Sequence, residues 1–135
     1  MSDGVFDLNE IVRRFPATAD TMLVDTRLTD EQVASCRVFR LYKPVPAHFH
    51  ATCDEYLLVL SGRGRFVIGS GTPFDIAPGQ LLHFKKATVH AVWSTSDEPL
   101  VFLAIDTPRR DPKDITFVNP ADGTAETFIQ TSNLY

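Results

Sequence analysis

Two histidines and a glutamate lie close together in the sequence. His48 and His50 are two residues apart, and Glu55 follows after a gap of four. Alternate residues of an extended strand point to the same face, so the two imidazoles would project together. Imidazole and carboxylate groups are ligands of divalent first-row metals. We therefore predict a metal site in residues 46–62, although such a trio also occurs by chance on solvated surfaces.

Other residues compete for places in this site. The remaining histidines are His83 and His90, and only a folded barrel could bring His90 to the first pair. Asp54 is the alternative carboxylate, but Glu55 opens an apolar run and is the better candidate. Cys53 offers a thiolate as a less favoured ligand. We expect His83 to be an exposed or barrel-wall residue.

Short strands separated by turns must position these side chains. Gly and Pro punctuate the chain, and apolar segments recur every eight to twelve residues, which predicts an all-β sandwich or barrel. We expect an edge strand at 22–24, a polar connection at 29–32, and a hairpin that pairs 65–68 with 55–60 across Gly62–Gly64. The remaining strands are predicted at 33–42, 72–76, 80–84, 90–93 and 100–105.

Both ends of the chain differ from this pattern. Residues 7–15 predict a short helix that Asp7 caps and Pro16 ends. After Asp106 the composition shifts: residues 107–112 look like a linker, and 115–118 and 126–129 predict two further strands. We expect this tail to cover the open edge of the barrel or a second subunit.

The composition limits the classes of function. The 135 residues, 44% of them hydrophobic, predict one domain spanning 1–135. The net charge of −4 is spread over both signs without a basic patch, so we expect no nucleic-acid partner. No apolar run has membrane length, the N-terminus lacks signal-peptide features, and there are only two cysteines, so we expect a cytoplasmic protein with no membrane partner.

Residues 33–106 resemble the cupin superfamily. The first cupin motif is Gly, five residues, His-x-His, three or four residues, Glu, six residues, Gly. Here His48-x-His50 is followed by four residues, Glu55, six residues and Gly62. The opening glycine of that motif falls at Tyr42, which departs from the pattern.

The second motif is degraded. It runs Gly, five residues, Pro-x-Gly, two residues, His, three residues, Asn, and here Gly79 is followed by Lys85–Ala87, His90 and Ser94 at that spacing. The departures affect turn positions and not ligands. The resemblance implies a double-stranded β-helix, also called a jelly-roll barrel, as the core at 33–106. It also implies one divalent transition metal held by the equivalents of the motif ligands, which are His48, His50, Glu55 and His90.

The resemblance leaves the reaction open. Four protein ligands on an octahedral ion leave two positions, which suits an oxygenase acting on a small oxygenated molecule. The alternatives are an isomerase or lyase acting on a sugar-like or keto acid, and a non-catalytic binding module. The metal could be Fe, Mn, Ni, Zn, Co or Cu.

The substrate contacts are predicted only weakly. Aromatic residues near the site in sequence or on other strands could form an apolar pocket, and two polar residues precede the first motif. The candidates are Arg40, Tyr42, Phe49, Phe66, Trp93 and Phe102. Because open sheet edges need covering and small cupins resemble dimers, we also expect a homodimer.

Overall fold

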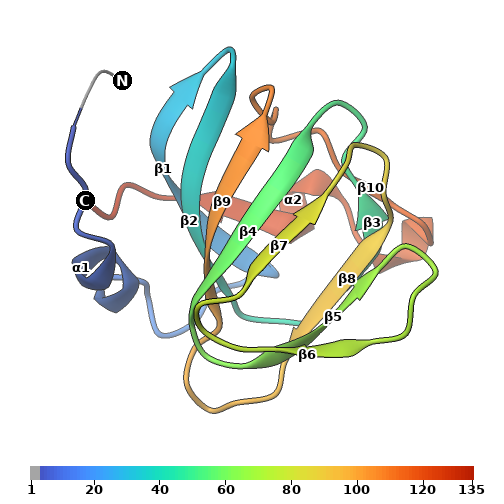
Figure 1. The fold of residues 1–135 in the computed structure, drawn as a ribbon, viewed down its shortest axis with the longest axis horizontal. Coiled ribbons are helices and arrows are strands. Elements are labelled where there is room, and N and C mark those ends of the chain that lie inside the picture. The colour runs from blue at the N-terminus through green and yellow to red at the C-terminus, as the bar shows by residue number, and fades with distance from the viewer. Residues whose placement is uncertain (1–3) are drawn as a thin grey trace.

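Two β-sheets face each other in the computed structural model, which describes residues 4–135 (Figure 1). One sheet has the order β11-β1-β2-β9-β4-β7, and the other has the order β10-β3-β8-β5-β6. The prediction of an all-β fold with a short N-terminal helix, α1 (Leu8–Arg13), is confirmed. The strands are β1 (Leu23–Glu31), β2 (Ala34–Leu41), β3 (Val45–Phe49), β4 (Asp54–Ser61), β5 (Gly64–Ile68), β6 (Phe74–Ile76), β7 (Leu81–Phe84), β8 (His90–Ser94), β9 (Val101–Thr107), β10 (Thr116–Phe117) and β11 (Ile129–Thr131).

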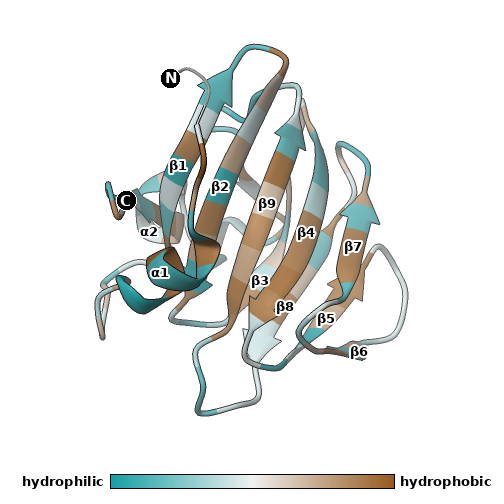
Figure 2. Cartoon of the chain, turned by 60° about the vertical axis from the view of Figure 1, so that its left-hand side comes forward, coloured by the Kyte–Doolittle hydropathy of each residue, from teal (hydrophilic) through white to brown (hydrophobic). Residues whose placement is uncertain are grey.

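The main hydrophobic core fills the space between the sheets. Alternating residues of each strand point inward, as β2 illustrates with Phe39 and Leu41. A second cluster lies on the outer face of the six-stranded sheet. Ile11 of α1 and Phe15, which follows the helix, pack there over Val38. Hydrophobic residues concentrate along β9, β4 and β7 (Figure 2). The sandwich therefore has one sheet whose outer face is covered by α1 over only part of its width.

Two predictions about the first half of the chain are wrong. β1 continues to Glu31, so residues 29–32 are mostly strand, because antiparallel pairing with β2 outweighs their polar composition. β4 and β5 do not form a hairpin, since β4 pairs with β7 and β9 while β5 pairs with β6 and β8. The chain instead crosses between the sheets at Gly62, whose φ is +75° and where a Cβ atom would lie 2.4 Å from the Pro99 carbonyl oxygen.

The C-terminal tail packs on its own barrel. β10 pairs with β3, and β11 runs parallel to β1. The predicted strand at 126–129 is instead the helix α2 (Ala125–Phe128), capped by the Thr124 hydroxyl and followed directly by β11. The short 3-10 helix η1 (Pro120–Asp122) precedes it. Residues 108–112 form the irregular connection between β9 and β10 that the linker prediction implies, but Arg110 within it is 1% exposed and packs into the barrel.

Within residues 4–135, no helix combines the length and hydrophobicity that crossing a lipid bilayer requires. α1 and α2 have six and four residues, and each is held by side-chain capping at its N-terminus. Asp7 accepts a hydrogen bond from the Glu10 backbone N–H at 3.2 Å, as the sequence pattern predicts.

Candidate metal centre

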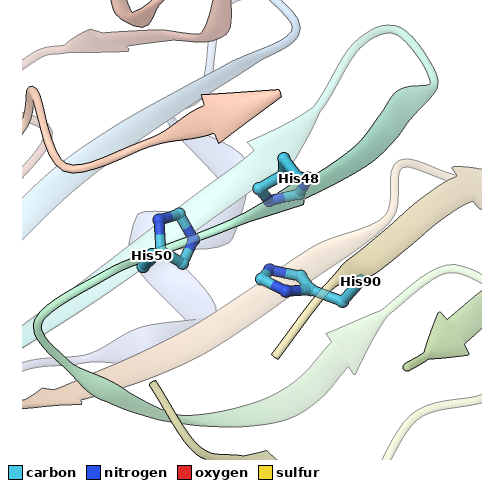
Figure 3. A group of neighbouring side chains, drawn as sticks. All are labelled: His48, His50 and His90. Atoms are coloured by element: carbon cyan, nitrogen blue, oxygen red, sulfur yellow. The ribbon is translucent and has the colours of Figure 1, made fainter. Parts of the chain in front are cut away.

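Three histidine side chains converge between neighbouring strands β3 and β8. His48 lies directly opposite His90 in the antiparallel register, and His50 follows at the end of β3 on the same face as His48. Figure 3 shows the three rings turned toward a common space. One ligand nitrogen from each ring can be chosen so that all three lie within 4.8 Å of one another.

Backbone carbonyls fix the orientation of all three rings. Nδ1 of His48 lies 2.8 Å from the Pro46 oxygen, and Nδ1 of His90 lies 3.0 Å from the Thr88 oxygen. Nδ1 of His50 lies 2.7 Å from the oxygen of Asp114. A carbonyl can only accept, so each Nδ1 carries the proton and each Nε2 keeps a free lone pair. Metal-binding histidines have this arrangement, in which an outer hydrogen bond sets the tautomer.

Burial keeps the three imidazoles neutral. Each is at most 4% exposed. Burial, and then His90, lowers the pKa of His48, while burial, and then Arg110, lowers the pKa of His50. Burial and the neighbouring His50 lower the pKa of His90 to about 3. Only neutral imidazole ligates a metal, so these rings are ready to bind one near neutral pH.

Glu55 reaches the histidines from the facing sheet. Its Oε1 atom lies 3.6 Å from Nε2 of His50 and 3.7 Å from Nε2 of His90. Two atoms that each lie about 2.1 Å from one ion would be about 3.0–3.4 Å apart at octahedral to tetrahedral angles. Burial, and then Asp106, raises the pKa of Glu55 to about 8. A cation at this position would favour the ionised carboxylate.

A buried arginine holds the other side of this carboxylate. Nη2 of Arg37 donates to Oε2 of Glu55 at 3.1 Å and leaves Oε1 facing the histidines. The same guanidinium donates to both oxygens of Asp106, at 2.8 and 3.1 Å, and to Asp25 at 3.2 Å. Burial disfavours its charge, but these carboxylates outweigh that effect and raise the pKa of Arg37. Arg37 therefore orients Glu55.

Two loops support the histidine cluster. The Asp114 carboxylate accepts hydrogen bonds from the backbone N–H groups of Ala51 and Thr52, at 2.7 and 3.1 Å, so the tail secures the loop after β3. Ala87 takes the place of the motif glycine with a φ of +64° and donates its N–H to the His50 oxygen at 2.7 Å. The left-handed conformation is thus kept without glycine, and the turn still leads into His90.

The histidines, Glu55 and both buried arginines border a partly open cavity of about 30 Å³. Phe66, one of the predicted substrate contacts, lines it, as do Phe39 and Phe128. This volume holds about two water-sized groups, so it accommodates an ion and a small ligand group. The surroundings are otherwise apolar, which strengthens electrostatic interactions inside.

The other predicted substrate contacts lie elsewhere. Arg40 stacks over the Tyr42 ring at 4.6 Å and, with it, lines a separate surface groove. Phe102 is fully buried and stacks on Phe39. Phe49 and Trp93 are partly buried and do not line the cavity, because they alternate with the inward-facing residues of β3 and β8.

The structure also places the competing candidates. His83 points outward from β7 and stacks on Tyr56 at 4.2 Å, away from the cluster. Asp54 accepts a hydrogen bond from the Lys86 backbone N–H at 2.9 Å. Cys53 is buried, and both it and Cys36 are free thiols.

Sequence reasoning missed three residues of the site. Arg37 sits inside an otherwise apolar strand, and an arginine there is a detectable signal for a buried ion pair. Arg110 and Asp114 lie in a polar, proline-containing stretch that gives no local indication of burial. Only the return of the tail onto β3 brings them to the histidines.

Comparisons with known proteins agree with this geometry. The family model described as "Cupin domain" matches residues 40–106. No curated protein sequence matches the chain. A Klebsiella pneumoniae protein with a double-stranded β-helix domain is similar in structure at 18% identity, with a TM-score of 0.65, covering 80% of this chain and 92% of that one.

Two further solved structures share the fold. KdgF from Halomonas sp. is 15% identical with a TM-score of 0.60 and covers 67% of this chain and 83% of its own. The DMSP lyase DddQ from Ruegeria pomeroyi is 22% identical with a TM-score of 0.56, and the match covers 67% of this chain and 45% of DddQ. These identities demonstrate a shared fold and not a shared reaction. The chain therefore carries a cupin domain at residues 40–106, within a double-stranded β-helix fold that it shares with these solved structures.

Proposed function

We propose that this cupin is a metal-dependent enzyme that acts on a small oxygenated molecule. One divalent transition metal would be held by His48, His50, His90 and Glu55. The proposal rests on one observation: three buried, neutral imidazoles have their Nδ1 atoms bonded to backbone carbonyls and their Nε2 atoms free. This donor set suits Fe, Mn, Co, Ni, Cu or Zn.

The bound ion would supply Lewis acidity and, for a redox-active metal, one-electron chemistry. The protein contributes orientation and exclusion of water. Arg37 holds Glu55 in place, and Phe66 and Phe128 form apolar walls of the cavity, which favours oxygenase chemistry beside an apolar part of the substrate. An isomerase or lyase is the second candidate, favoured by a buried cation, Arg110, that could stabilise an anionic substrate.

Oxygen consumption separates these two candidates. We expect protein reconstituted with Fe²⁺ to consume dioxygen in the presence of its substrate, and the His90→Ala variant to lose at least 99% of that rate. The measurement is a screen of small hydroxy and keto acids in an oxygen electrode, repeated without oxygen. Substrate conversion at an unchanged rate under anaerobic conditions would replace the oxygenase proposal by the isomerase or lyase. Fe²⁺-loaded protein that converts nothing would leave a binding module.

We also propose a homodimer that uses the outer face of the six-stranded sheet. α1 covers this face over β1 and β2, whereas apolar side chains remain exposed over β4, β7 and β9. Tyr56 lies beside Ile105 in the strand register, and Leu58 lies beside Leu81, which is 63% exposed. Because the tail packs on its own barrel, a second copy would be held by this face and not by exchanged tails.

Light scattering tests the dimer. The wild-type chain should have twice the 15.1 kDa chain mass at micromolar concentration. The double variant Tyr56→Asp/Leu81→Asp should be a folded monomer, since dimer formation would bury two unpaired charges in the interface. Aspartate at Val118, which is 57% exposed on the tail, is the matched control and should leave the dimer intact. A wild-type monomer contradicts the proposal.

A further inference from the structure

Arg110 is a buried cation without a partner. It is 1% exposed, and its Nε, Nη1 and Nη2 atoms have neither solvent contact nor a hydrogen-bond acceptor within residues 4–135. The other buried arginine of the site, Arg37, bonds three carboxylates. Burying a charged group without a partner costs several kcal/mol. This contrast indicates that Arg110 has a task other than stabilising the fold.

The backbone of Arg110 is held firmly in place. Its N–H donates to the Ser35 hydroxyl at 3.2 Å, and its carbonyl accepts from Nη2 of Arg27 at 3.1 Å. The guanidinium carbon lies 5.8 Å from the centre of the Phe128 ring, and the side chain lines the same cavity as His48, which projects from β3. The guanidinium is therefore directed into the site by a fixed main chain and an aromatic wall.

The charges around the cavity favour an anion once the ion is present. Three carboxyl groups, those of Asp25, Glu55 and Asp106, are buried with the guanidiniums of Arg37 and Arg110. With all of them ionised, one negative charge is in excess. A divalent ion changes this to one positive charge in excess, and a singly charged anion would neutralise it. A carboxylate also matches the planar fork of a guanidinium.

We propose that Arg110 binds the carboxylate of a small carboxylic acid substrate, whose other oxygens face the metal position. This inference rests on the proposed function and narrows its substrate class. With the ion present, the cavity of about 30 Å³ limits the enclosed portion of the substrate to its carboxylate group. Arg110 is thus a substrate-binding and specificity residue contributed by the tail beyond the barrel.

Calorimetric titration of protein loaded with Mn²⁺ tests this assignment without measuring turnover. Acetate and pyruvate are the probes, and acetamide is the neutral counterpart of acetate. We expect acetate and pyruvate to bind and acetamide not to bind. Arg110→Met should weaken acetate and pyruvate binding by about 30-fold or more while the Mn²⁺ content stays the same. Arg109→Met, which removes a partly exposed arginine paired with Asp30, is the matched control and should bind like the wild type.

Thermal unfolding provides a second readout. Because Met would replace an unpartnered buried charge, Arg110→Met should raise the Tm of the ligand-free protein by about 3 °C or more. Acetate should raise the Tm of the Mn²⁺-loaded wild type and not that of the Mn²⁺-loaded variant. A variant that unfolds at a lower Tm would indicate a structural role and overturn the inference, and Arg110→Lys then tests whether charge alone preserves the fold.

The outcomes separate this inference from the proposed function. Wild-type protein that holds Mn²⁺ but binds neither acetate nor pyruvate, or an Arg110→Met variant that binds them equally well, overturns the role of Arg110 and leaves the metal centre standing. If the wild type holds no divalent ion, the proposed function fails. In that case, the inference is still supported if the metal-free wild type binds acetate and the Arg110→Met variant does not. If the metal-free wild type binds no acetate, the inference is overturned.

Discussion

Replacing His48 and His50 together by alanine should reduce the bound divalent metal from one ion per chain to nearly none. The two side chains supply half of the expected ligands, and His90 with Glu55 cannot hold the ion alone. Loss of one outer hydrogen-bond partner already costs about 10–100-fold in metal affinity, so loss of two ligands should exceed that range. Elemental analysis of untagged protein after dialysis measures this directly.

Single variants refine the assignment. His90→Ala and Glu55→Ala should each weaken metal binding strongly, because each removes a donor that faces the common centre. His83→Ala is the matched control, since this ring stacks on Tyr56 outside the site. Asp54→Ala is the second control, because its carboxylate caps a backbone N–H of Lys86. Full metal content in the double variant would refute the metal centre.

Arg37→Met should destabilise the protein by about 3–5 kcal/mol, the range for breaking a buried ion pair by removing one partner. The guanidinium is 3% exposed and is the shared partner of Asp25, Glu55 and Asp106. Removing it leaves three carboxyl groups close together without a hydrogen-bonded counter-charge, since only the guanidinium of Arg110, which bonds none of them, stays nearby. Its charge and hydrogen bonds also outweigh burial and hold the pKa of Asp106 well below its usual range. Urea unfolding of both proteins at pH 7 gives the difference.

The control for this variant is the same substitution at a surface arginine. Arg65 pairs with Asp75, and their side chains are 42% and 89% exposed. Arg65→Met should therefore change the stability by less than about 1 kcal/mol. If Arg37→Met unfolds at the same urea concentration as Arg65→Met, the buried network does not stabilise the fold. If Arg37→Met lowers the free energy of unfolding as expected, we also expect weaker metal binding, since Glu55 loses its orienting partner.

Local pattern predicted much of the barrel and of the candidate site. The spacing of His48, His50 and Glu55 and the position of His90 are periodic or motif features, and they survive in a chain that has lost the motif glycine at Ala87. Strand positions could be predicted from turn residues and from the alternation of apolar and polar residues, because side chains of a strand point to opposite faces in turn. The crossing of the chain from one sheet to the other at Gly62 could not be predicted from this local pattern.

The sequence by itself therefore determined the fold class, the cupin resemblance and the histidine cluster, since each depends on residue type at short spacing. Tertiary structure alone decided the partners of that cluster. Strand pairing and the returning tail bring Arg37, Arg110 and Asp114 to it, across separations such as the 64 residues between His50 and Asp114. Whether an arginine is saturated or unpartnered depends on which carboxylates the folded chain places beside it, and no local pattern records those distances.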